Sequence, residues 1–175
     1  LRFRRHEWQS RLPRAAVRRK VGVLSADGLL ELHERHPERY PVLLESVGDD
    51  ARLGRYDLLF ALPEARLVRH ADGSLQGPGA GAGHGSFLDG LDAWWEAEGG
   101  RQCVADPLPF CGGWVLYLGY ELAAEIEPRL RMPASGLPRA VAWRMRGALL
   151  RDRATGEVIA CAEAAVQERL AAQLA

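Results

Sequence analysis

The segment from Pro109 to Leu122 limits the possible folds of this chain more than any other stretch. It joins the glycine pair Gly112-Gly113 to an apolar run that ends at Tyr120, and a short helical pattern follows up to Glu127. A run that is apolar on both faces is typical of a central strand in a covered sheet. The glycine pair indicates a positive φ angle, or the close approach of another backbone, where the chain enters that sheet.

Helical and strand patterns are mixed along the rest of the chain. Apolar residues at helical spacing predict helices over 29–36, 87–98 and 166–174, the second with Ser86 as its N-cap. Apolar or alternating runs predict strands over 41–46, 55–62, 65–70, 113–120, 141–146 and 157–162. Together they predict an α+β domain in which antiparallel β-sheets pack against α-helices.

Two further features of the sheet are predicted from short connections and from alternation. Only Pro63-Glu64 separates 55–62 from 65–70, so these strands are predicted to pair as an antiparallel hairpin. The segment 141–146 alternates between larger apolar residues, which are Val141, Trp143 and Met145, and a second set, which is Ala142, Arg144 and Arg146. One face of that strand is therefore predicted to be exposed to solvent.

The length of 175 residues and the hydrophobic content of 47% predict one domain with a sizeable core. We expect it to span residues 22–175, with a flexible loop over 73–86, where six of fourteen residues are glycine. Residues 1–21 are basic and show no sustained apolar period, so they are expected to form a disordered leader. A mitochondrial transit peptide or an arm that binds nucleic acid is the other interpretation of this leader.

Composition argues against several classes of partner. The chain has 23 basic and 23 acidic residues, so no overall charge favours nucleic acid or an anionic membrane. Its apolar runs are far shorter than the roughly 20 residues that cross a bilayer. Cys103, Cys111 and Cys161 lack a C-x-x-C spacing, which predicts neither a disulfide framework nor a zinc site. We therefore expect a cytoplasmic protein that binds neither nucleic acid nor membrane.

The sequence contains no recognisable catalytic centre or metal site. The motifs G-x-S-x-G and H-E-x-x-H and the P-loop do not occur. His33 and His36 have a spacing at which two side chains can share a metal, but the acidic residues around them favour a solvated helix face. Cys111 has no basic neighbour in sequence that would activate a thiolate, so it is predicted to pack as a small apolar side chain.

Glu45 and Ser46 are the polar residues that indicate binding. They follow Leu43-Leu44 at the end of a predicted strand. A carboxylate there can pair with an ammonium group, and a hydroxyl can donate or accept a hydrogen bond, so the pair fits a site for an amino acid. The same pattern also fits a strand end that turns into solvent. The residues alone leave both interpretations open.

Three motifs resemble the N-terminal domain of component I of the chorismate-utilising synthases, the family of anthranilate synthase and aminodeoxychorismate (para-aminobenzoate) synthase. Leu43-Leu44-Glu45-Ser46 matches the family's L-L-E-S motif, and Arg55-Tyr56-Asp57 matches its R-[YF]-D strand. The family's G-G-x-x-G-Y-x-G-Y-[DE] strand is matched by Gly112, Gly113, Tyr117, Gly119, Tyr120 and Glu121, with Leu116 in place of the middle glycine. The similarity extends from about Leu29 to Ala162, and the short spacing of the first two motifs is closer to the aminodeoxychorismate branch.

The resemblance implies a scaffold or regulatory domain of an aminodeoxychorismate synthase, a transferase that replaces the C4 hydroxyl of chorismate with ammonia in folate biosynthesis. In that family L-L-E-S forms part of a pocket for tryptophan. The expected tryptophan-like pocket consists of Leu43, Leu44, Glu45 and Ser46. The expected supporting strands contain Arg55, Tyr56, Asp57, Gly112, Gly113, Tyr117, Gly119 and Tyr120.

The resemblance also implies what this sequence lacks. The family's catalytic residues and its Mg²⁺ belong to a C-terminal chorismate-binding domain, and a glutamine amidotransferase subunit supplies the ammonia. We therefore expect this chain to hold no catalytic residue, metal ligand or cofactor, and to leave chorismate unchanged by itself. Two alternatives remain: the N-terminal domain of anthranilate synthase component I in tryptophan biosynthesis, and a free-standing regulatory domain that binds an amino acid.

Overall fold

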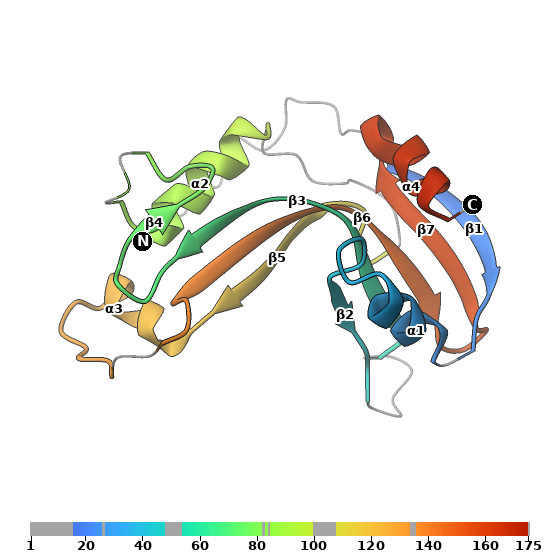
Figure 1. The fold of residues 1–175 in the computed structure, drawn as a ribbon, viewed down its shortest axis with the longest axis horizontal. Helices are drawn as coiled ribbons and strands as arrows, with labels where there is room; N and C mark the ends of the chain where they lie inside the picture. Colours follow the sequence, from blue (N-terminus) through green and yellow to red (C-terminus); the bar gives the residue numbers. More distant parts are fainter. Residues whose placement is uncertain are drawn as a thin grey trace, which may run out of the picture.

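The computed structural model describes residues 16–25, 27–47, 54–81, 83, 85–99, 108–133 and 136–174. In these residues seven strands form one antiparallel sheet, against which four α-helices pack (Figure 1). The α+β class predicted from the sequence is confirmed.

Two long strands, β3 (Tyr56–Arg69) and β6 (Ala140–Asp152), run through the whole sheet. They pair with each other from Tyr56 opposite Asp152 to Arg69 opposite Ala140. Short strands extend each end of this central pair, so the sheet has two differently built halves. One half adds β2 (Val42–Leu44), β7 (Glu157–Glu163) and β1 (Ala16–Val23), and the other adds β4 (Leu75–Gln76) and β5 (Gly113–Leu118).

Strand β3 is bent, not broken, at the point where a hairpin was predicted. Leu62 has a φ angle of 55°, and the register of β3 against β6 shifts between Pro63 and Arg66. Such a β-bulge increases the local twist, and Pro63 has no N–H group to donate to the ladder. The predicted hairpin is wrong, because both halves pair with β6 as one continuous strand.

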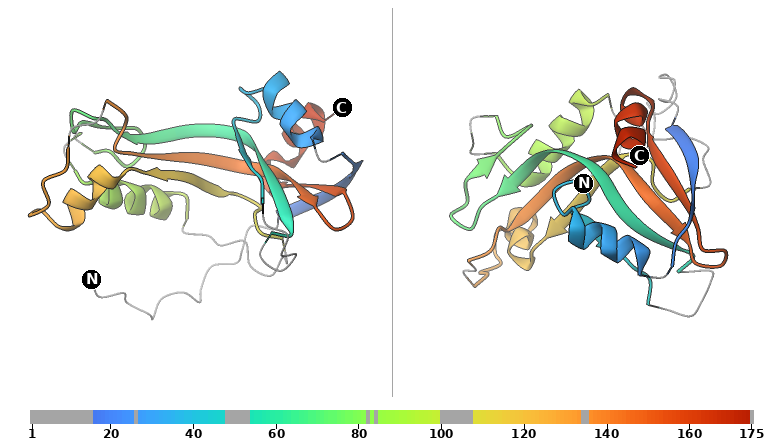
Figure 2. Two further views of the ribbon diagram at one scale, coloured as in Figure 1. Left: turned by 90° about the horizontal axis from the view of Figure 1, so that it is seen from below. Right: turned by 45° about the vertical axis from the view of Figure 1, so that its right-hand side comes forward.

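The helices cover opposite faces at the two ends of the sheet (Figure 2). They are α1 (Gly28–Arg35), α2 (Phe87–Ala97), α3 (Ala123–Ile126) and α4 (Gln167–Gln173), with 3-10 turns at Tyr120–Leu122 and Ala164–Val166. Helices α1 and α4 lie on one face, and α2 lies on the other. Ser86 caps α2 as predicted, because its hydroxyl accepts a hydrogen bond from the N–H of Asp89 at 3.0 Å.

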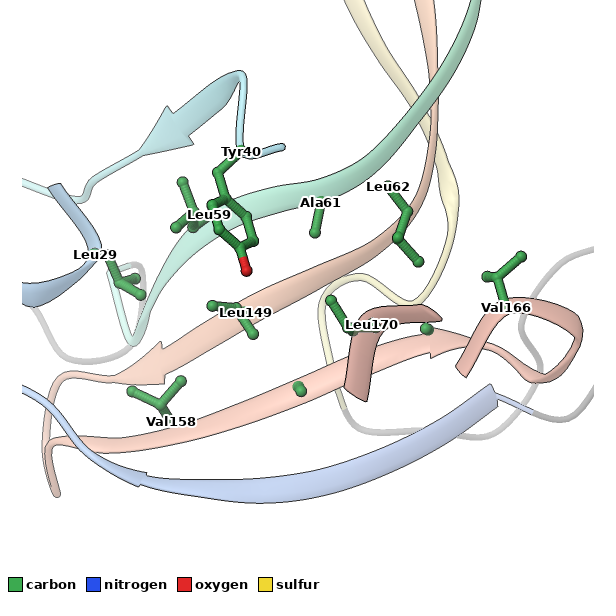
Figure 3. Close-up of a cluster of buried hydrophobic side chains, with 11 residues drawn as sticks. Leu29, Tyr40, Leu59, Ala61, Leu62, Leu149, Val158, Val166 and Leu170 are labelled. Atoms are coloured by element: carbon green, nitrogen blue, oxygen red, sulfur yellow. The ribbon is translucent and has the colours of Figure 1, made fainter. Parts of the chain in front are cut away.

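Each face of the sheet has its own core. Under α1 and α4, Tyr40, Leu59 and Leu149 are buried among leucine and alanine side chains from both helices and from β7 (Figure 3). On the opposite face, neighbours of Leu149 on β6 such as Leu150 enter another cluster, as alternation along a strand requires. A third cluster under α2 includes Phe87.

Several expectations about exposed segments need correction. Residues 16–21, predicted to belong to a disordered leader, form most of β1 and pair with β7. An edge strand can be held by backbone hydrogen bonds to its neighbour even when its sequence has no apolar period. Residues 1–15 lie outside the described residues. In the predicted flexible loop over 73–86, Leu75 is buried and β4 pairs with β3, contacts that the glycine content did not predict.

Two expectations about strand faces are also wrong. Strand β5 was predicted to be central, but among the described residues it pairs only with β6 and leaves Leu116 to Leu118 exposed. Arg144 was predicted to face solvent, but only 5% of it is exposed, because Glu163 pairs with its guanidinium under Trp114. A local alternation pattern cannot predict an ion pair with a residue on another strand.

The cysteines also depart from expectation. Cys111 is disulfide-bonded, although no disulfide was predicted. Cys161 is a buried thiol outside any disulfide. Spacing rules recognise frameworks of several bonds and not a single bond. In the part of the chain that the structure describes, no helix has the length and apolar character needed to cross a membrane.

Candidate functional site

One hollow brings together most residues of the first two motifs. It lies where β2 ends and β3 begins and has a volume of about 440 Å³. Its walls are formed by Leu44, Glu45, Ser46, Arg55, Tyr56, Leu58 and Pro109, and we call it the strand-end pocket. Pockets of about 300–1,000 Å³ are typical of sites for small molecules.

The pairing of β2 with β3 decides which motif residues reach this pocket. Leu44 lies opposite Leu58, and both side chains line it. Leu43 lies opposite Leu59, and its side chain packs against the core on the other face of the sheet. Because successive side chains of a strand point to opposite faces, Leu43 supports the strand and does not line the pocket.

Asp57 holds the two chain segments of the pocket together from behind. Its side chain is 8% exposed. It accepts a hydrogen bond from the backbone N–H of Ser46 at 3.2 Å and another from the Arg151 guanidinium at 3.2 Å. Arg153 lies 3.9 Å from the same carboxylate. The position of Ser46 is therefore tied to a neutralised, buried acid.

Gly54 allows the close approach of these segments. A Cβ atom at this position would lie 3.0 Å from the Cβ of Ser46 and 3.2 Å from its Oγ. Any side chain at residue 54 would therefore push against the Ser46 wall of the pocket. Arg153 closes the same corner by donating a hydrogen bond to the Gly54 carbonyl at 3.1 Å.

Arg55 brings a positive charge to the rim of the pocket. Its guanidinium donates two hydrogen bonds to one oxygen of the buried Asp152, at 2.9 and 2.8 Å, and lies 5.0 Å from the centre of the Tyr56 ring. Burial raises the pKa of Asp152, but the hydrogen bonds from Arg55 and from the N–H of Ala154 outweigh it and hold that pKa below its ordinary value. Since 59% of the Arg55 side chain is exposed, it can still contact a ligand.

The pocket has the chemical groups that bind an amino acid. Glu45 is exposed and has no ion-pair partner among the described residues, so its carboxylate can accept hydrogen bonds from an ammonium group. The Arg55 guanidinium can donate hydrogen bonds to a carboxylate. Apolar walls are formed by Leu44, Leu58 and Tyr56. Among the described residues, no group of three or more His, Cys, Asp or Glu side chains is placed to hold a metal ion.

The glycine-tyrosine motif lies outside the strand-end pocket. Gly113 and Tyr117 belong to β5, and Gly119 and Tyr120 belong to the turn that follows. The Tyr120 side chain is 88% exposed. Pro109, which precedes the motif, reaches the pocket wall.

The glycine pair instead makes room for a buried charge cluster, which we call the Glu163 cluster and which contains Arg144, Arg146 and Glu163. Gly112 has a φ angle of 136°, and a Cβ atom there would lie 2.6 Å from Glu163 Oε1. Arg146 donates to Glu163 Oε2 at 3.0 and 2.8 Å, and Arg144 bonds the other oxygen. Arg144 also donates to the Gly113 carbonyl at 3.0 Å. The close approach predicted for the glycine pair is therefore present, but the group that approaches Gly112 is the Glu163 side chain and not another backbone.

Sequence reasoning missed the residues that support the pocket from β6. Arg151, Asp152 and Arg153 lie near the turn between β6 and β7, far from the first two motifs in sequence. An acidic residue between two arginines beside a predicted turn is the only local signal for them. Their partners on β3 could not be identified before the pairing of β3 with β6 was known.

Comparison with solved structures shows a fold similar to that of anthranilate synthase component I from Streptococcus pneumoniae TIGR4, with a TM-score of 0.52 and 22% sequence identity. The similarity covers 76% of this chain and 29% of that chain. At this level of identity the likeness establishes the shared fold. No protein-family model matches the chain, and a comparison with curated proteins gave no match.

Proposed function

We propose that this chain is the N-terminal scaffold and ligand-sensing domain of an aminodeoxychorismate synthase component I. Its strand-end pocket binds a small molecule that carries an amine, with tryptophan as the first candidate. One observation carries this proposal: Glu45-Ser46 and Arg55-Tyr56, which lie apart in sequence, form the walls of one hollow. The fold shared with anthranilate synthase component I supports the chorismate-utilising class.

The expected mode of binding uses charges on both sides of the ligand. The Glu45 carboxylate accepts hydrogen bonds from the ligand's ammonium group, and the exposed edge of Arg55 contacts its carboxylate. The ring of Tyr56 and the side chain of Leu44 contact an apolar or aromatic side chain. The backbone N–H of Ser46 is bonded to Asp57, so this segment of the pocket wall is held before the ligand arrives.

In the proposed enzyme this domain does not carry out the chemistry. Amination of chorismate toward 4-aminobenzoate, in the cytoplasm, takes place on a chorismate-binding domain that holds Mg²⁺. Ammonia comes from a glutamine amidotransferase subunit. The similarity covers 29% of the anthranilate synthase component I chain, which supports a role as one part of a larger enzyme. Purified chain mixed with chorismate, Mg²⁺ and ammonium is expected to form no aminated product.

Two alternatives make different predictions. An anthranilate synthase component I would have the same domain, and the amination product of the full enzyme would distinguish it. A free-standing regulatory domain would bind tryptophan tightly without any other region. The proposed synthase domain is expected to bind it weakly, because in the family the missing region completes the pocket.

Isothermal titration with L-tryptophan tests the pocket. Glu45→Gln removes the charge that faces the ammonium group, so affinity is expected to fall by roughly tenfold or more, in line with about 1.5–3 kcal/mol for a hydrogen bond to a charged group. Glu96→Gln on the exposed side of α2 is the matched control and is expected to have no effect. Indole-3-propionate, which lacks the amine, is expected to bind no better to the unaltered chain than to Glu45→Gln. Equal tryptophan binding by both variants would contradict the proposal.

A further inference from the structure

Strand β5 is an edge strand of the sheet in the part of the chain that the structure describes. Among the described residues it pairs only with β6, and Leu116, Tyr117 and Leu118 are 47%, 46% and 53% exposed. Edge strands of monomeric proteins usually carry charged residues, proline or bulges that prevent pairing with another chain. The sequence of β5, Gly-Trp-Val-Leu-Tyr-Leu, has no charged residue and no proline, and its ladder with β6 has no shift in register. This edge is therefore suited to pairing with another strand.

An apolar hollow lies beside the same edge. It has a volume of about 430 Å³ and lies between α2 and β5. Its walls are formed by Leu91, Asp92, Trp95, Trp114 and Leu116. Because side chains alternate, Trp114, Leu116 and Leu118 share the face of β5 that α2 covers, and Val115 and Tyr117 lie on the other face. One strand thus carries a hollow beside Trp114 and an exposed leucine four residues further on.

This arrangement is complementary to itself. A two-fold axis perpendicular to the sheet keeps the faces of two antiparallel β5 strands together, so residues of the same face lie opposite each other. With the axis through Leu116, Trp114 lies opposite Leu118 of the second copy, and Val115 lies opposite its Tyr117. Leu118 of each copy then meets the hollow of the other. No like charges meet within the two paired strands, because β5 has none.

We propose that β5 is a dimerisation edge at which two copies of this chain pair antiparallel through Leu116 and continue the sheet from one copy into the other. This dimer buries the exposed leucines and fills both hollows. It needs no ligand in the strand-end pocket, so it stands or fails independently of the proposed function.

Sedimentation velocity over a series of concentrations tests the dimer. The unaltered chain is expected to show a monomer–dimer equilibrium. Leu116→Lys and Leu116→Glu each place like charges opposite each other on the axis, and each is expected to lose the dimer. An equimolar mixture of the two variants puts lysine opposite glutamate and is expected to restore it. Circular dichroism checks that each variant remains folded.

Leu137→Lys is the matched control. Leu137 is 63% exposed and lies outside β5, so this variant is expected to dimerise like the unaltered chain. An unaltered chain that stays monomeric at every concentration would overturn the proposal. So would a Leu116→Lys variant that still dimerises alone, or a mixture of the two Leu116 variants that stays monomeric.

Discussion

Two regions of the sheet contain buried carboxylates held by arginines, but these regions differ in how much charge they expose. At the strand-end pocket, Asp57 and Asp152 bind Arg151 and Arg55. In the Glu163 cluster, one glutamate binds both Arg144 and Arg146. The Arg144 side chain is 6% exposed, whereas the Arg55 side chain is 59% exposed. The first network therefore presents charge to solvent, and the second encloses it.

This difference shows that a buried ion pair does not by itself mark a binding site. The Glu163 cluster connects β6, β7 and the glycine pair before β5, and its role is to hold these segments together. The pocket network also supports the backbone, through Ser46, but it leaves Arg55 accessible and lies beside the exposed Glu45. The accessible charges, not the buried ones, identify the candidate site.

The largest expected effect comes from breaking the enclosed network. Glu163→Gln removes the carboxylate that Arg144 and Arg146 share and leaves the buried Arg144 with Glu98, 3.5 Å away. Loss of a buried ion-pair partner costs about 3–5 kcal/mol of the free energy of unfolding. Urea unfolding followed by circular dichroism measures it. Glu96→Gln, on the exposed side of α2, should change the free energy of unfolding by less than about 0.5 kcal/mol. A loss below about 1 kcal/mol for Glu163→Gln would show that the cluster is not the support we describe.

A smaller loss is expected when the glycine pair is altered. Gly112→Ala places a Cβ atom against Glu163 at a φ angle of 136°, so about 1–3 kcal/mol of stability should be lost. The control is Gly136→Ala, because nothing lies within 4 Å of a Cβ atom there and its φ is not positive. Equal stability of the two variants in the same urea assay would mean that Glu163 moves away at little cost.

The pocket network is expected to make the free energy of unfolding depend on pH in the acidic range. The pKa of Asp152 is lowered in the folded chain, so its charge contributes stability above its unfolded pKa of about 3.9, and this contribution is lost as the pH falls through the lower folded value. Asp152→Asn removes that contribution at all pH values. The variant's urea midpoint should therefore fall less than that of the unaltered chain between about pH 5 and pH 3. Parallel acid profiles would contradict the assignment.

The smallest effect is expected for an arginine outside both networks. Arg66 lies 3.5 Å above the Trp143 ring on an exposed part of the sheet. Arg66→Ala should cost about 0.5–1 kcal/mol, as exposed cation–π contacts do. The urea assay measures this loss in the free energy of unfolding. A loss as large as that of Glu163→Gln would contradict the distinction between exposed and enclosed contacts.

Local patterns predicted the elements that depend on neighbours in sequence. Helix α2 with its Ser86 cap and helix α1 belong to the α+β class that is confirmed. Glu45 and Ser46 were singled out for their chemistry at a strand end. Their function stays a prediction, although the structure places them beside Arg55 and Tyr56.

The parts that sequence could not predict depend on partners far along the chain. Arg55 and Asp152 are 97 residues apart, and Arg144 and Glu163 are 19 apart. Alternation alone indicated that Arg144 faces solvent, because nothing near it in sequence shows that Glu163 lies opposite. Pro63-Glu64 had the composition of a turn, but a bulge in a continuous strand tolerates the same residues.

Backbone amide chemical shifts during a titration with L-tryptophan test the central claim most directly, because both networks are observed in one experiment. We predict that the amides of Glu45, Ser46 and Tyr56 shift with ligand concentration, and that those of Arg144 and Glu163 do not. Shifts confined to the Glu163 cluster, or no shift at any concentration in residues that line the strand-end pocket, would contradict the account.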